Sequence, residues 1–149
     1  MVHVLIVEAR FYEEIADELS AGAIEALEAA GASYERLSVP GAFEIPAAIS
    51  LADIGGQYDG YLALGCVIRG ETTHYDYVCV ESARKLMDLA TDRALPIGYG
   101  ILTCENDEQA WERARRDRKN KGGDVAKACL RMIELAERYV GPLLEEEDA

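Results

Sequence analysis

The sequence predicts one α/β domain, a three-layer sandwich in which a parallel four-stranded sheet lies between two layers of helices. Three observations support this fold. Short apolar runs alternate with segments of helical period along the whole chain. Gly or Pro separates most of these segments. The first apolar run, residues 2–7, is nearly continuous, as a strand that is covered on both faces requires.

The expected elements alternate from end to end. Strands are predicted over residues 2–7, 34–39, 61–68 and 97–102. Helices are predicted over residues 15–30, 47–54 and 76–94, around residues 110–114, and over residues 125–140. Gly31 is the expected C-cap of the first helix, Pro46 suits the first turn of the second, and Gly55-Gly56 end it. Gly122-Gly123 is expected to interrupt the helical region after the fourth strand, and Gly141-Pro142 to stop the last helix.

Right-handed crossovers between these strands favour a flavodoxin-like sheet with the order 2-1-3-4. The strand order reverses between the first and third strands, and ligands bind at such a point, outside the carboxyl ends of the strands. We therefore expect a site beside the loops at residues 8–12 and 65–76. The domain is expected to span residues 1–141, and the acidic tail at residues 142–149 to lack stable structure.

Composition narrows the function classes. The chain has 149 residues, 50% of them hydrophobic, which suffices for one core, and its formal net charge of −13 argues against nucleic-acid and membrane partners. No apolar run reaches the ~20 residues of a membrane span, and no secretory signal is apparent. The four cysteines are scattered without a Cys-x-x-Cys spacing, so we expect reduced thiols in a cytoplasmic protein, with no metal site and no disulfide.

The segment from Gly65 to Asp76 carries the strongest local signal, because a buried strand ends there in a polar turn before a helix. Backbone N–H groups of Gly70, Glu71 and Thr72 are suited to a phosphate, although Thr72 is equally suited to cap the helix. His74 is either a proton-transfer group or a surface residue that caps the helix. Asp76 either orients the imidazole or caps the helix.

Other candidates have a structural alternative too. The rings of Phe11, Phe43 and Tyr99 could stack on a planar heterocycle or pack in the core. Glu44 follows a Pro-Gly turn, where a carboxylate favours a helix N-terminus in any case. Cys66 is a possible thiol catalyst, but a small buried hydrophobe is the favoured interpretation. A basic cluster between residues 113 and 127 suggests a small anion, which its members Arg113 and Lys121 could reach, although most of the cluster is expected to be a solvated face.

Several collinear stretches resemble the lumazine synthase family, over roughly residues 4–136. They are Arg10-Phe11, the run Val39 to Pro46, the run Gly65 to Val78, Gly100 to Thr103 with Glu108-Gln109-Ala110, and Asn120-Lys121-Gly122. The second and third stretches are long and specific. The resemblance implies the same flavodoxin-like fold that the strand pattern predicts.

The resemblance also implies a reaction. The family condenses 5-amino-6-(D-ribitylamino)uracil with 3,4-dihydroxy-2-butanone 4-phosphate to 6,7-dimethyl-8-ribityllumazine, a transferase step of riboflavin biosynthesis that releases phosphate and water. It uses no metal and no organic cofactor. Such a reaction needs two oriented substrates, a proton shuttle and a phosphate pocket. The alternative is a flavin- or lumazine-binding paralogue with weak turnover.

By position, the resemblance implies a role for each candidate. Phe11 is similar to the ring that stacks on the pyrimidine, and His74 to the general acid/base. Tyr99 matches an aromatic residue, and Arg113 a phosphate-binding arginine, that reach in from a neighbouring subunit. The ribityl group is expected at Ala42, Phe43 and Glu44, the pyrimidine at Cys66, Val67 and Ile68, and the phosphate at Gly70, Glu71 and Thr72, with Lys121 beside Arg113.

Two departures from the family concern assembly. Its icosahedral members carry a Gly-Thr-Lys-like linker where this chain has Arg115 to Lys119, and an N-terminal extension that adds a strand to the neighbouring subunit, whereas here the first strand starts at once. We therefore expect a homopentamer with shared active sites, acting on small-molecule substrates, and no 60-subunit shell.

Overall fold

Within residues 1–148, which this computed structural model describes, four parallel strands form one sheet in the order β2-β1-β3-β4. They are β1 (His3–Ala9), β2 (Ser33–Val39), β3 (Gly60–Ile68) and β4 (Ile97–Cys104). In register, Val7 of β1 lies opposite Leu37 of β2 and Ala63 of β3. The strand order, the parallel direction and the flavodoxin-like fold class that the sequence predicts are thus confirmed.

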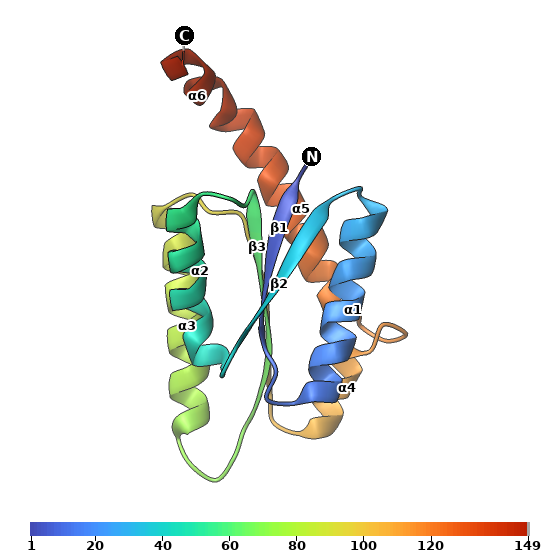
Figure 1. The fold of residues 1–149 in the computed structure, drawn as a ribbon. Helices are drawn as coiled ribbons and strands as arrows, with labels where there is room; N and C mark the ends of the chain where they lie inside the picture. The colour runs from blue at the N-terminus through green and yellow to red at the C-terminus, as the bar shows by residue number, and fades with distance from the viewer. Residues whose placement is uncertain (149) are drawn as a thin grey trace.

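Helices cover both faces of the sheet (Figure 1). On one face lie α1 (Glu13–Ala29), α4 (Asp107–Ala114) and α5 (Lys121–Tyr139); on the other lie the short 3-10 helix η1 (Ala42–Glu44), α2 (Ile45–Gly55) and α3 (His74–Asp92). The residues that were expected to mark the ends of the first two helices do so. Pro46 lies in the first turn of α2, and Gly31 and Gly56 take the left-handed φ values of +74° and +67° after α1 and α2.

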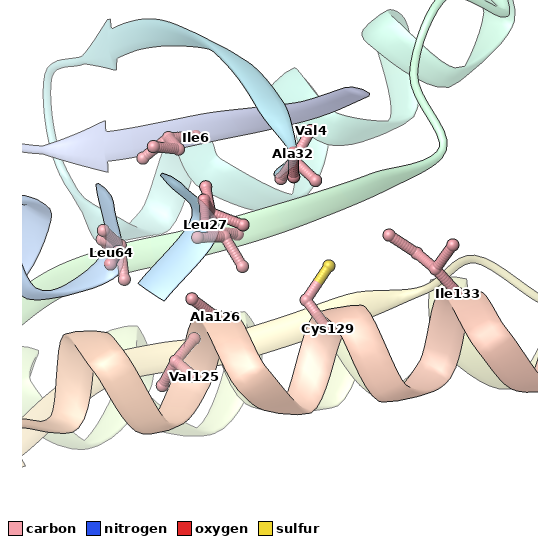
Figure 2. Close-up of a cluster of buried hydrophobic side chains, with 11 residues drawn as sticks. Val4, Ile6, Leu27, Ala32, Leu64, Val125, Ala126, Cys129 and Ile133 are labelled. Atoms are coloured by element: carbon pink, nitrogen blue, oxygen red, sulfur yellow. The ribbon is translucent and has the colours of Figure 1, made fainter. Parts of the chain in front are cut away.

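The core consists of two apolar layers because side chains of β1 alternate between the faces of the sheet. Val4 and Ile6 point toward α1 and α5, and Figure 2 shows them with Leu27 and with Ala126, Cys129 and Ile133 of α5. Leu5 and Val7 point the other way. They pack with Ile45 and Ile49 of α2 and Leu86 of α3. Burial on both faces explains the nearly continuous apolar run of β1.

The glycine pair at 122–123 does not interrupt a helix, contrary to the prediction. It lies inside the first turn of α5, and the break between α4 and α5 falls at residues 115–120. A Cβ on Gly122 would lie 2.0 Å from the carbonyl oxygen of Leu19 in α1. Gly122 is therefore a close-packing contact between α1 and α5, whereas Gly123 packs against Asn120. Asn120, with φ +46°, begins α5 by accepting from the N–H of Gly123.

The acidic segment that was expected to lack stable structure is helical in the structure. Helix α6 (Gly141–Asp148) continues beyond α5 and the sheet (Figure 1). Pro142 suits a first helical turn, and the leucine and glutamate residues that follow are good helix formers. Residue 149 lies outside the described residues, and the domain limit at residue 141 stays a prediction. None of the helices in residues 1–148 combines the length and apolar character that a membrane span needs.

Candidate active site

A recess of about 530 Å³ lies where the loops after β1, β2 and β3 meet. We call it the main recess. The loop after β1 contributes Phe11 and Tyr12, and the turn after β2 contributes residues 40–44. The remaining walls come from the end of β3 and the start of α3, namely Cys66, Val67, Ile68, Gly70, Thr72, His74, Tyr75 and Val78. The switch point of the strand order therefore carries a recess, as the topology predicts.

Two aromatic rings stand open to solvent at the main recess. Phe11 is 76% exposed and Phe43 is 57% exposed. The ring of Phe11 touches Tyr12 edge-on, with 4.9 Å between the ring centroids. Neither ring is a core residue, so the alternative that they simply pack in the core is wrong. Exposed rings beside a recess suit a planar ligand that would cover them.

The β3–α3 turn presents His74 at the first position of α3, as the sequence predicts. Its backbone N–H donates to the hydroxyl of Thr72 at 3.3 Å, so Thr72 takes part in the local capping of the helix. The side chains of Thr72 and His74 are both exposed and both line the main recess. The turn at the start of a helix and an imidazole therefore lie side by side, which suits an anion next to a proton donor.

Asp76 has a partner other than the imidazole. Its carboxylate accepts from Arg69 Nη1 at 3.2 Å, and Arg69 Nε donates to Glu105 at 2.8 Å. The same guanidinium lies 4.3 Å above the ring of Tyr75. Arg69 thus links the turn after β3 with the turn after β4, and Asp76 belongs to that link.

Cys66 lies half-buried at the end of β3. Burial raises the pKa of its thiol to about 12, and the neighbouring thiol of Cys104 adds to the effect. A thiol with such a pKa carries almost no thiolate at neutral pH, and the thiolate is the nucleophile. The structure therefore favours Cys66 as part of the wall over Cys66 as a catalyst.

Glu44 ends the short helix η1 and stands at the N-cap position of α2. Its carboxylate folds back toward Gly41, where a Cβ would lie 3.3 Å from Glu44 Oε2. Ala42 is buried beneath this turn, whereas the side chain of Glu44 is exposed and lines the main recess. The turn thus presents a carboxylate acceptor to any ligand hydroxyl that enters.

A second recess of about 230 Å³ lies along β4, an outer strand of the sheet. We call it the β4-edge recess. Tyr99 and Thr103 of β4 line it, together with Arg113 of α4 and Lys121 at the start of α5. Arg113 Nη1 donates to the carbonyl of Gln109 at 3.0 Å, which fixes the guanidinium along α4. Two cations and a tyrosine are thus gathered on the outer edge of the sheet.

The structure divides the predicted site residues into two groups. Those of the first three loops share the main recess, whereas Tyr99, Arg113 and Lys121 share the β4-edge recess. Tyr99 was predicted to reach the pyrimidine from a neighbouring subunit; within its own chain it lines the β4-edge recess, and its phenol lies beside Ser82 of α3. Glu71 is exposed in the turn and lines neither recess.

Five further residues line the main recess without having been singled out: Tyr12, Pro40, Gly41, Tyr75 and Val78. For α3 a signal was present, because Val78 lies four residues after His74 and three residues after Tyr75, and both spacings place side chains on one side of a helix. For Tyr12 the sequence offered no signal other than its position next to Phe11. Among residues 1–148, no group of three or more His, Cys, Asp or Glu side chains is arranged to hold a metal ion.

Known proteins resemble this chain over nearly its whole length. The family model described as 6,7-dimethyl-8-ribityllumazine synthase matches residues 1–137. A 6,7-dimethyl-8-ribityllumazine synthase of Bartonella tribocorum is 61% identical over 138 residues, which cover 92% of this chain and 91% of that protein. The 6,7-dimethyl-8-ribityllumazine synthase 1 of Rhizobium meliloti is 61% identical over 142 residues, covering 92% and 93%, and the synthase of Agrobacterium fabrum is 60% identical over 144 residues, covering 93% and 97%. With its matching fold and with one recess at the switch point, the chain belongs to the 6,7-dimethyl-8-ribityllumazine synthase family.

Proposed function

We propose that this protein is an enzyme of riboflavin biosynthesis that makes 6,7-dimethyl-8-ribityllumazine. It condenses 5-amino-6-(D-ribitylamino)uracil with 3,4-dihydroxy-2-butanone 4-phosphate. Identity above 60% to synthases that bear this name supports the assignment. The structural observation that carries it is the main recess, where an exposed ring, a carboxylate and an imidazole come from three different loops.

The main recess suits the pyrimidine substrate. The exposed ring of Phe11 offers a stacking surface for a planar heterocycle. The end of β3, from Cys66 to Ile68, brings backbone groups to the wall for hydrogen bonds to the ring edge, and the turn from Ala42 to Glu44 offers the ribityl hydroxyls a carboxylate acceptor. Holding both reactants in the right orientation can lower the barrier by roughly 7–11 kcal/mol without a cofactor.

The chemistry needs little more than proton movement. The 5-amino group attacks the ketone and an imine forms with loss of water, phosphate is then eliminated, and the second amine closes the ring with loss of another water. His74 lies beside the turn of Gly70 and Thr72 and is our candidate to move these protons. The N–H groups of that turn are candidates to hold the phosphate before it leaves, with Glu71 turned outward.

We further propose that the site is completed by a second copy of the chain. Arg113, Lys121 and Tyr99 gather in the β4-edge recess, away from the main recess of their own chain. A dianionic phosphate needs cations as well as N–H groups, and none of the residues that line the main recess within residues 1–148 is Lys or Arg. Placing the β4 edge of one subunit against the main recess of the next supplies them.

A ring of five subunits is the assembly that we propose for this shared site. Large apolar side chains are exposed on the outer faces of α2 and α3, where Leu51 is 72%, Ile54 73% and Met87 62% exposed. Apolar patches of this kind mark interfaces. Light scattering on the purified protein should give a mass near five subunits, and a mass near sixty would refute the proposal. The free thiols of all four cysteines are typical of a cytoplasmic location, which we also propose.

Lumazine fluorescence tests the reaction directly. Purified protein mixed with both substrates should form the fluorescent product well above the uncatalysed rate. Product formation at the background rate only would refute the enzyme assignment and leave a lumazine-binding protein as the alternative.

The substitution Arg113→Ala tests the phosphate assignment. It removes a charge-assisted contact, so the KM for the butanone phosphate should rise by about 10- to 100-fold. The KM for the pyrimidine substrate should stay within about twofold. A loss confined to the pyrimidine would contradict the role.

Mixing two variants tests the shared site. In oligomers assembled from Arg113→Ala and His74→Ala chains, a site built from the main recess of the first and the β4 edge of the second is intact. Random mixing makes about a quarter of the sites intact, so activity measured at a butanone phosphate concentration below the wild-type KM should rise well above that of either variant alone. If activity stayed at the average of the two variants, each chain would hold a complete site by itself.

A further inference from the structure

Glu8 is a buried carboxylate that none of the proposed catalytic steps uses. It lies at the end of β1 and is 3% exposed. Arg36 of β2 binds it with two nitrogens, Nε to Oε2 at 2.8 Å and Nη2 to Oε1 at 3.0 Å. Arg10 binds it with Nη1 at 2.9 Å to Oε1. Both oxygens are therefore paired, as a buried charge requires.

The two arginines differ in what else they hold. Arg36 lies within β2, whose backbone is already fixed by the strand pairing with β1, and its Nη2 also donates to the Ser20 hydroxyl of α1. Arg10 lies in the loop after β1, and its Nη2 donates to Asp17 of α1. The guanidinium of Arg10 thus ties the loop to the sheet through Glu8 and to α1 through Asp17.

This loop carries Phe11, and little else holds it. Outside the regular helix and strand bonds, the backbone of Arg10 and of Phe11 makes no hydrogen bond to another backbone group among residues 1–148. The ring of Phe11 is exposed and has an aromatic contact only with its neighbour Tyr12, as far as the described chain goes. Since consecutive Cα atoms are ~3.8 Å apart, fixing residue 10 fixes where the ring of residue 11 starts.

We propose that Glu8 and Arg10 are positioning residues that hold the Phe11 ring at the main recess for the pyrimidine substrate. A buried ion pair is weak evidence for stability, because an apolar group of similar shape often serves the fold as well. Here Arg10, one of the two arginines that bind Glu8, lies in the loop that bears the stacking ring of Phe11. This inference rests on the proposed function for the identity of the ligand, but the position of the loop can be measured without any substrate.

The matched variants Arg10→Met and Arg36→Met test it, because each removes one arginine from the same carboxylate. Arg10→Met should raise the KM for the ribitylaminouracil about tenfold and leave the KM for the butanone phosphate within about twofold. The Kd for 6,7-dimethyl-8-ribityllumazine, followed by its fluorescence, should rise similarly. Arg36→Met should lower the Tm and leave both KM values within about twofold. Equal effects of the two variants on the pyrimidine KM would overturn the proposal, since they would mean a merely structural ion pair.

Hydrogen exchange gives a readout that needs no substrate. Amides of residues 10–12 should exchange at least tenfold faster in Arg10→Met than in Arg36→Met. Equal exchange would overturn the positioning role even if the protein makes lumazine. Faster exchange in a protein without turnover would sustain the positioning role and refute only the proposed reaction. Asp17→Asn changes an exposed carboxylate and keeps the buried pair, so it should fold and shift the exchange and the pyrimidine KM in the same direction by a smaller factor.

Discussion

The thiol of Cys66 lies in the wall of the main recess, and burial raises its pKa to about 12. A catalytic thiol would need the opposite shift. Cys66→Ala should therefore retain turnover within about threefold, since only packing beside the recess is lost. The measurement is kcat at saturation of both substrates, with the rate of alkylation of wild-type protein by iodoacetamide at neutral pH as a second check. A loss of turnover beyond 100-fold would show that the thiol takes part in the chemistry.

His74 and Asp76 lie two residues apart at the start of α3 but have different surroundings. His74 lines the main recess, whereas Asp76 pairs with Arg69. His74→Ala should lower kcat by about 10²- to 10⁴-fold, the usual worth of general acid/base help, with the gain from proximity remaining. Asp76→Asn is the matched control and should keep kcat within about threefold. If both variants lost turnover equally, Asp76 would orient the imidazole after all.

At the scale of elements, the contact between α1 and α5 depends on a residue without a side chain. A Cβ on Gly122 would lie 2.0 Å from the Leu19 carbonyl oxygen, which is backbone and cannot move aside alone. Gly122→Ala should destabilise the protein by about 1–3 kcal/mol through overpacking. The measurement is the free energy of unfolding in urea.

Gly55→Ala is the control for that change. Gly55 lies at the end of α2, and a Cβ there meets nothing within 4 Å. Alanine should be neutral or stabilise by about 0.4–1 kcal/mol, because it restricts the unfolded chain. Equal destabilisation by both substitutions would mean that helix flexibility, and not the α1–α5 contact, sets the effect.

At the scale of the whole molecule, the core limits stability at high pH. Cys129 is fully buried beneath the sheet, and burial raises the pKa of its thiol from its ordinary value of 9.0 to about 12. Desolvation likewise raises the pKa of the buried Tyr61 to about 12. A raised pKa in the folded state means that this contribution is complete below about pH 9 and is lost as the pH rises toward 12.

Cys129→Ala tests this pH dependence. The variant should be less stable at pH 7 by about 1–2 kcal/mol because a buried sulfur is lost. Its free energy of unfolding should fall less steeply than that of the wild type between pH 9 and pH 11. Parallel curves for the two proteins would exclude the thiol as a source of alkaline unfolding.

Local patterns determined the strands, most of the helices and the sheet order of this protein. Apolar runs and helical periods depend on neighbouring residues, and right-handed crossovers leave few ways to connect four alternating strands. The same logic predicted a site after β1 and β3, and Phe11, Glu44 and His74 do line one recess. The family motifs that supply most of the lining of the main recess are continuous in sequence. Most of these lining residues could therefore be predicted from the sequence alone.

Only the tertiary structure decided which distant residues meet. Tyr99, Arg113 and Lys121 line a recess of their own along β4, and only the folded chain shows that this recess and the main recess share no residue. Gly122 looked like part of a helix break because its contact, Leu19, is a hundred residues away. Arg10 looked like part of a motif, but its partners Glu8 and Asp17 lie on two different elements. Periodicity is a local property, whereas these contacts arise when crossovers bring the faces of separate elements together.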